Sequence, residues 1–134
     1  MKIAFTTEDL VHVNAHFGWA RKIAIYEVTA ESSSLLKVVE FAGDLKEDGN
    51  EDKLAPKIEA IADSAMLYVS AIGGSGAARV VAAGIHPVKV LETEKIDDII
   101  AKLQAVFRGT PPPWLRKAMN KGKERKLDFE VVHG

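Results

Sequence analysis

The chain has no cysteine among its 134 residues. Disulfide bonds, a zinc ribbon and an iron–sulfur cluster held only by thiolates are therefore excluded. The formal net charge is −1, so no global excess of basic residues points to nucleic acid. No apolar run is long enough to cross a bilayer, and the first residues lack the apolar stretch and cleavage site of a signal peptide. We expect a cytoplasmic protein that binds neither nucleic acid nor a membrane.

The size and composition fit one globular domain. A chain of this length is close to the usual domain size, and 47% hydrophobic residues are enough to build a core. The residues after 121 are mostly charged. We therefore expect a single domain over residues 1–121 and a charged C-terminal tail over residues 122–134.

The hydrophobic pattern predicts an α/β fold. Three β-prone runs with short links indicate an antiparallel meander, and the remainder alternates helices and strands. The predicted strands are residues 2–7, 21–28, 35–41, 65–71 and 87–91. The first predicted helix carries Leu54, Ile58 and Ile61, and because of Pro56 it either begins near Leu54 or begins after a cap at Asn50 and bends. The other predicted helices are residues 77–83, a helix that Thr93 caps and that runs to about Phe107, and residues 114–119. The last βαβ unit requires a parallel pair. The result is a mixed five-stranded sheet with helices on both faces, in a ribonuclease-H-like layout.

The loop after the first strand carries the first group of candidate binding residues, namely His12, Asn14, His16, Phe17 and Gly18. Imidazole is the commonest metal ligand where thiols are absent, and it binds reversibly. A glycine allows the backbone to approach a ligand closely. We interpret His12 as a surface histidine that can assist, and His16, next to Phe17 and Gly18, as the candidate ligand.

A glycine-rich turn supplies the second group, Gly73, Gly74, Ser75 and Gly76, with Arg79 in the helix that follows. Such a turn between a buried strand and a helix exposes backbone N–H groups at the positive end of the helix dipole. The same glycines also suit a tight turn with no ligand. A dinucleotide fingerprint is excluded because Arg79 stands where a small residue is needed, and a P-loop is excluded because no Gly-Lys-Ser/Thr follows.

The two groups are expected to face one another. If the first and fourth strands are neighbours, the loops that follow them open at the same end of the sheet. Open α/β sheets bind ligands at that end. The predicted topology therefore favours one binding site shared by the His16 loop and the turn at residues 73–76.

Several segments together resemble the dinitrogenase iron–molybdenum cofactor-binding family. They are Val-Asn-Ala-His-Phe-Gly-Trp-Ala at 13–20, Asn-Glu-Asp-Lys-Leu at 50–54, Ala-Ile-Gly-Gly-Ser-Gly-Ala at 71–77, Gly-Ile-His-Pro-Val-Lys-Val at 84–90 and Pro-Trp-Leu-Arg-Lys-Ala at 113–118. The resemblance covers nearly the whole chain and implies the ribonuclease-H-like fold.

The resemblance implies binding without catalysis. The implied cargo is the iron–molybdenum cofactor or an iron–sulfur precursor, passed among the NifB enzyme, the NifEN scaffold and apo-nitrogenase. The family's cluster ligand corresponds to His16, and the turn at residues 73–76 corresponds to the facing loop. One or two imidazoles with backbone N–H groups and a nearby Arg79 or Arg21 would hold an anionic cluster reversibly, whereas four thiolates would hold it more tightly.

Two other functions follow from the same residues. An anion-binding adaptor could dock on the cofactor assembly scaffold without holding a cluster. A metal-dependent hydrolase of ribonuclease-H type needs carboxylates on the sheet, and the first strand has none because Glu8 and Asp9 lie beyond its end.

Overall fold

The computed structural model describes residues 1–41 and 54–119, and the predicted tail at 122–134 lies outside them. Five strands form one sheet in the order β4-β3-β1-β5-β6. Their bounds are β1 Lys2–Thr7, β3 Lys22–Val28, β4 Ser33–Glu40, β5 Met66–Val69 and β6 His86–Lys89. The pairs β4–β3 and β3–β1 are antiparallel, whereas β1–β5 and β5–β6 are parallel. The predicted mixed sheet is therefore confirmed, with the first and fourth main strands side by side.

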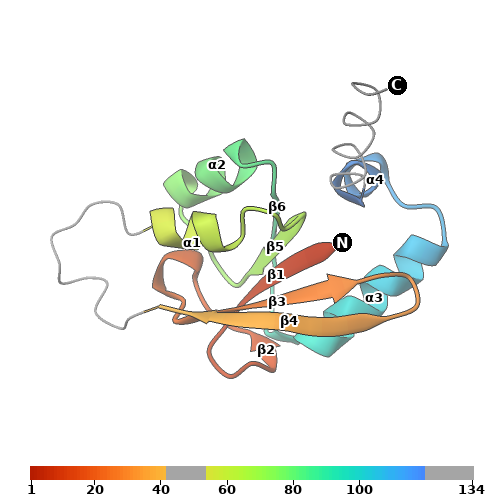
Figure 1. The fold of residues 1–134 in the computed structure, drawn as a ribbon, viewed down its shortest axis with the longest axis horizontal. Helices are drawn as coiled ribbons and strands as arrows, with labels where there is room; N and C mark the ends of the chain where they lie inside the picture. The colour runs from red at the N-terminus through yellow and green to blue at the C-terminus, as the bar shows by residue number, and fades with distance from the viewer. Residues whose placement is uncertain (42–53, 120–134) are drawn as a thin grey trace, which may run out of the picture.

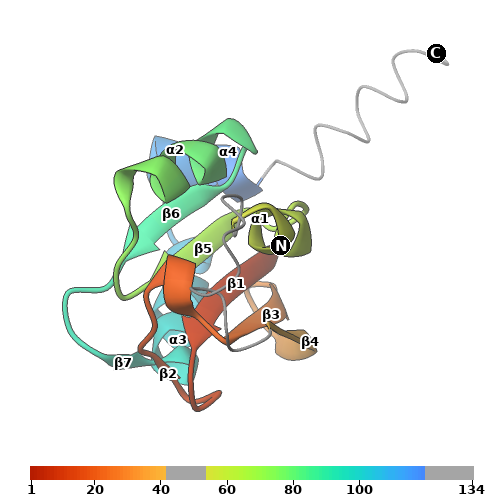
Figure 2. The ribbon, with the colours of Figure 1, turned by 90° about the vertical axis from the view of Figure 1, so that its left-hand side faces the viewer.

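Helices cover both faces of this sheet (Figures 1 and 2). They are α1 Ala55–Ala60, α2 Gly74–Ala82, α3 Ile96–Arg108 and α4 Pro113–Met119. Successive side chains of a strand point to opposite faces. Accordingly Phe5 packs in a core with residues of α3 and α4, whereas Ala4 packs in a second core with Val80 of α2 and residues beside α1.

Two helices begin at other residues than the sequence predicts. Helix α2 starts at Gly74, so the last part of the glycine-rich turn is itself the first helical turn. The prediction that Thr93 caps α3 is wrong, because the residue before the helix is Lys95 and it makes no side-chain cap. The chain stays extended through Glu94–Lys95, where it pairs with another segment.

That pairing forms a second, two-stranded sheet that the sequence did not reveal. Strand β2 (His12–Val13) lies antiparallel to β7 (Glu94–Lys95), and Figure 2 shows the pair at the lower end of the molecule. Ile96 N–H also donates to Val11 O over 2.8 Å. The loop after β1 is thus fastened at its middle to the start of α3.

Candidate functional site

The His16 loop is bonded directly to the end of β5. His16 forms a parallel β-bridge with Ala71. Phe17 N–H donates to Ala71 O over 2.8 Å, and Ser70 N–H donates to Ala15 O over 3.1 Å. Since the glycine-rich turn begins two residues after Ala71, the predicted convergence of the two loops is confirmed.

The imidazole of His16 is half-buried and acts as the cap of a short 3₁₀ turn, η1 (Phe17–Trp19). Gly18 N–H donates to His16 Nδ1 over 2.9 Å, and Trp19 N–H donates to His16 O over 3.1 Å. A neutral ring that accepts at Nδ1 carries its proton at Nε2. A metal bound at Nδ1 would therefore release the Gly18 N–H group, which could then donate to the ligand.

The indole of Trp19 lies beside this imidazole. The two ring centroids are 6.1 Å apart, and Trp19 is 61% exposed. An exposed large aromatic next to a partly buried imidazole gives the site an apolar rim that remains open to solvent.

The glycines of the facing turn have different roles. A side chain at Gly76 would meet Phe17 Cδ2 at 3.4 Å and Ile72 Cγ1 at 3.3 Å, so Gly76 allows helix α2 to pack closely on buried Phe17. Gly73 and Gly74 face open space. Gly76 is thus a packing residue, whereas Gly73 and Gly74 leave the backbone accessible.

The first turn of α2 offers hydrogen-bond donors. Gly73 is its cap residue, and the first intrahelical bond shown runs from Ala77 N–H to Gly73 O over 2.9 Å. The N–H groups of Gly74, Ser75 and Gly76 precede that bond and have no acceptor within the helix. They lie at the positive end of the helix dipole, which favours anions. Arg79 lies one turn further on and is partly buried.

His12 and Asn14 are engaged within the loop. His12 Nδ1 lies 2.7 Å from Asp9 Oδ2, and the Asn14 Oδ1 atom accepts from Glu8 N–H over 2.8 Å. Asp9 also accepts from the backbone N–H of His12, and these hydrogen bonds lower the pKa of its carboxyl. Both side chains therefore shape the loop that carries His16.

Lys57 is a component of the site that the sequence analysis missed. Its ammonium is fully buried and donates to Phe17 O and Gly18 O, each over 3.0 Å. The ring of Phe41 lies 5.2 Å from the ammonium. Burial lowers the pKa of Lys57 to about 8, against the opposing attraction of Glu8. A positive charge therefore lies directly beneath the turn that His16 caps.

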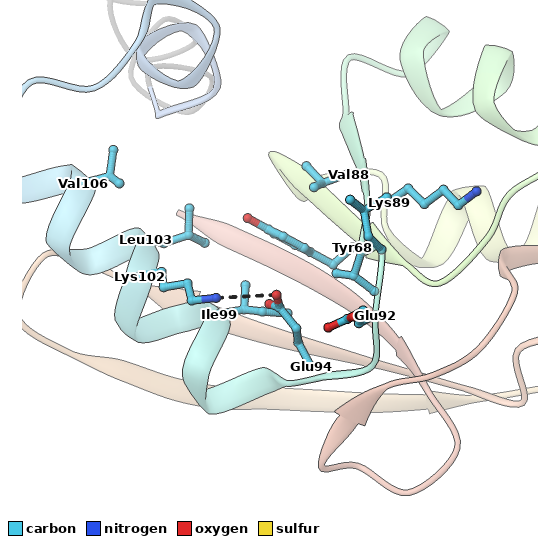
Figure 3. Close-up of a pocket in the computed structure, with 11 residues that line it drawn as sticks. Tyr68, Val88, Lys89, Glu92, Glu94, Ile99, Lys102, Leu103 and Val106 are labelled. Atoms are coloured by element: carbon cyan, nitrogen blue, oxygen red, sulfur yellow. Dashed lines mark hydrogen bonds and ion pairs between the residues drawn. The ribbon is translucent and has the colours of Figure 1, made fainter.

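Two cavities lie elsewhere, and neither is lined by His16 or the glycine turn. Figure 3 shows the larger, of about 560 Å³, between α3 and the segment that follows β6. Burial, together with Glu94, raises the pKa of Tyr68 in its wall to about 12. Lys102 Nζ lies 3.4 Å from Glu94 Oε1 at the rim. The second, of about 450 Å³, is lined in part by His86 and Trp114.

In the described part of the chain, no three His, Asp or Glu side chains gather into a group that could hold a metal ion.

A protein-family model identifies the family of this chain. The family model described as dinitrogenase iron-molybdenum cofactor matches residues 1–106. The chain belongs to this family. The resemblance inferred from the motifs is thereby confirmed.

Named relatives agree with this assignment. Protein NifX of Herbaspirillum seropedicae is 62% identical over 97% of this chain and 89% of its own length, and Protein NifX of Azotobacter vinelandii is 44% identical over 100% and 86%. FeMo cofactor biosynthesis protein NifB of Bradyrhizobium diazoefficiens is 29% identical over 84% of this chain but only 25% of its own length. This chain therefore corresponds to nearly all of the NifX proteins and to one part of NifB.

One solved structure supports the fold alone. The crystal structure of PH0822 superposes with a TM-score of 0.60 at 21% sequence identity, over 78% of this chain and 89% of that one. Within residues 1–41 and 54–119, moreover, no helix has the length and apolarity needed to cross a membrane.

Proposed function

We propose that the chain is a nitrogen-fixation accessory protein that binds, stores and carries the iron–molybdenum cofactor or an iron–sulfur precursor. The observation that carries this proposal is the bonded junction of His16 with Ala71. It holds a half-buried imidazole beside a helix N-terminus whose first N–H groups lack helical acceptors. This combination suits a cargo that has exchangeable metal positions and a negative charge.

The role proposed for the site is binding without catalysis. His16 is the metal ligand, and the N–H groups of Gly18, Gly74 and Ser75 donate to sulfides at the cluster surface. Each such contact is weaker than a thiolate–metal bond, so an acceptor protein that offers thiolates can withdraw the cargo. His12 supports the loop through Asp9, and Arg79 contributes positive charge near the helix start.

The proposed partners are the NifB enzyme, the NifEN scaffold and apo-nitrogenase. The family description and the similarity to part of NifB support this context. We also propose that the layout is ribonuclease-H-like. Three antiparallel strands followed by two parallel strands, with helices on both faces, support that assignment.

The test is an anaerobic titration with isolated iron–molybdenum cofactor, followed by gel filtration and measurement of retained iron and molybdenum. We expect about one equivalent on the wild type. His16→Asn should retain much less, although an asparagine side chain can still cap the Gly18 N–H group. His16→Ala removes both the ligand and the cap, so it should lose cofactor and some stability as well.

The outcomes separate the alternatives. Undiminished binding by His16→Asn, with an unchanged melting temperature, would refute the ligand assignment while leaving the carrier function intact. If the wild type retains no cofactor but still co-purifies with the NifEN scaffold, the adaptor function replaces the carrier function.

A further inference from the structure

The peptide groups of the η1 turn are held from both sides. In a trans peptide the C=O and N–H bonds point in opposite directions. The Phe17 C=O points to Lys57 Nζ, and the N–H of the same peptide, on Gly18, points to His16 Nδ1. The next peptide repeats the pattern: Gly18 C=O accepts from Lys57 Nζ, and Trp19 N–H donates to His16 O.

We infer that Lys57 is the positioning residue of the proposed anion site. Its ammonium fixes both peptide planes so that their N–H ends face His16. This inference rests on the proposed function for the nature of the ligand. The orientation of the turn does not depend on the proposed function, because it follows from the four hydrogen bonds. Lys57 acts from beneath the turn and does not touch the ligand.

Charge reinforces this orientation. Hydrogen bonds from a charged donor are about twice as strong as neutral ones. The ammonium also polarises the peptide groups that it binds, which makes their N–H ends better donors. Its contacts shown in the structure are two carbonyl oxygens and the Phe41 ring, with no ion pair among the described residues. Within the described part of the chain, the ammonium therefore directs its charge at the two carbonyl oxygens of the turn.

Stability alone does not account for a lysine at this position. A buried charge is disfavoured by desolvation, and well-packed apolar residues often replace buried charges without loss of stability. Lys57 follows the same helical spacing as Leu54, Ile58 and Ile61, which pack in the core beside it. A methionine would continue this face and would remove the charge and the two hydrogen bonds, which leaves the carbonyl oxygens of Phe17 and Gly18 without this donor.

The test compares three variants in the full chain, Lys57→Met, Lys57→Arg and the core control Ile61→Val. The first readout uses cofactor-free protein and records the amide signal of Gly18 and the ring nitrogens of His16 by NMR. Lys57→Met should shift both signals toward a broken Gly18–His16 hydrogen bond. Lys57→Arg should restore much of the wild-type pattern, and Ile61→Val should leave it unchanged.

The second readout is the affinity for isolated iron–molybdenum cofactor. We expect Lys57→Met to weaken binding about tenfold or more, because the N–H groups of the turn are then no longer held in place and the positive charge beneath them is lost. Unchanged NMR signals together with unchanged affinity in Lys57→Met would overturn the inference while leaving the proposed function standing. A wild type that binds no cofactor would overturn the proposed function, and the NMR arm would still decide whether Lys57 orients the turn.

Discussion

The indole of Trp114 stacks on the imidazole of His86, with ring centroids 4.3 Å apart and the planes inclined by 17°. This contact joins helix α4 to the edge strand β6, and it lies beside the smaller cavity. Burial lowers the pKa of His86.

The stability of the protein should therefore decrease in mild acid through His86. Because its folded-state pKa is below the ordinary value, the unfolded chain takes up a proton first as the pH falls below about 6.5. The effect should be small because the ring is partly solvated. Urea unfolding between about pH 8 and pH 5, followed by tryptophan fluorescence, measures it. In His86→Phe this acid-dependent loss should shrink, and an identical pH profile would contradict the assignment.

Lys57 predicts the same direction of pH dependence at alkaline pH, with stability increasing as the pH rises. Its pKa falls from 10.5 to about 8 in the folded protein. The unfolded chain then holds the proton more strongly than the folded one, so stability rises as the pH increases from about 8 toward 10.5. One pKa unit corresponds to about 1.4 kcal/mol, which gives a gain of up to about 3 kcal/mol. Denaturant unfolding of the wild type and Lys57→Met should show the rise in the wild type only.

The glycines of the turn should respond differently to alanine. Gly76→Ala places a methyl group against Phe17 and Ile72 and should destabilise the fold by about 1 kcal/mol. Gly74→Ala lies in the same helical turn but faces open space, so it should be neutral or stabilising by up to about 1 kcal/mol. Thermal unfolding of the two variants side by side gives the comparison, and equal effects would contradict the packing role of Gly76.

Thr6 should hold the His16 loop onto the sheet. Its fully buried hydroxyl donates to Ala15 O over 2.8 Å and lies 3.3 Å from Tyr68 O. Thr6→Val keeps the shape but removes the donor, which should cost about 1–2 kcal/mol. In Thr6→Val, hydrogen exchange at the amides of Phe17 and Gly18 should be faster than in the wild type. Thr6→Ser retains the hydroxyl and should exchange nearly as slowly as the wild type.

The large elements of the fold were predictable because their signals are long. Each main strand is a run of apolar or alternating residues, and the order of elements requires the parallel pair beside the antiparallel meander. Strands β2 and β7 have two residues each, which is too short for any periodicity. Their pairing also keeps the chain extended to Lys95, so the local capping preference of Thr93 was overridden by a tertiary contact.

The location of the candidate site was predictable from the sequence, but the prediction did not include all of its residues. His16 and the glycine turn were found because their residue types are chemically distinctive and their strands are neighbours. Lys57 was missed because a lysine is normally assumed to be solvated. Its position, three residues after Leu54 and four before Ile61 on the buried face of α1, was the signal that was available.

The anchoring of the His16 loop has a consequence for release of a ligand. The loop leaves β1 and is bonded to the end of β5, and these two strands occupy the centre of the sheet. Central strands are usually the last to open in native-state fluctuations. Release of a bound ligand by local unfolding of this junction should therefore be slow. If the protein carries a cofactor as proposed, we expect transfer to proceed by ligand exchange within an encounter complex, at a rate that depends on the concentration of the acceptor.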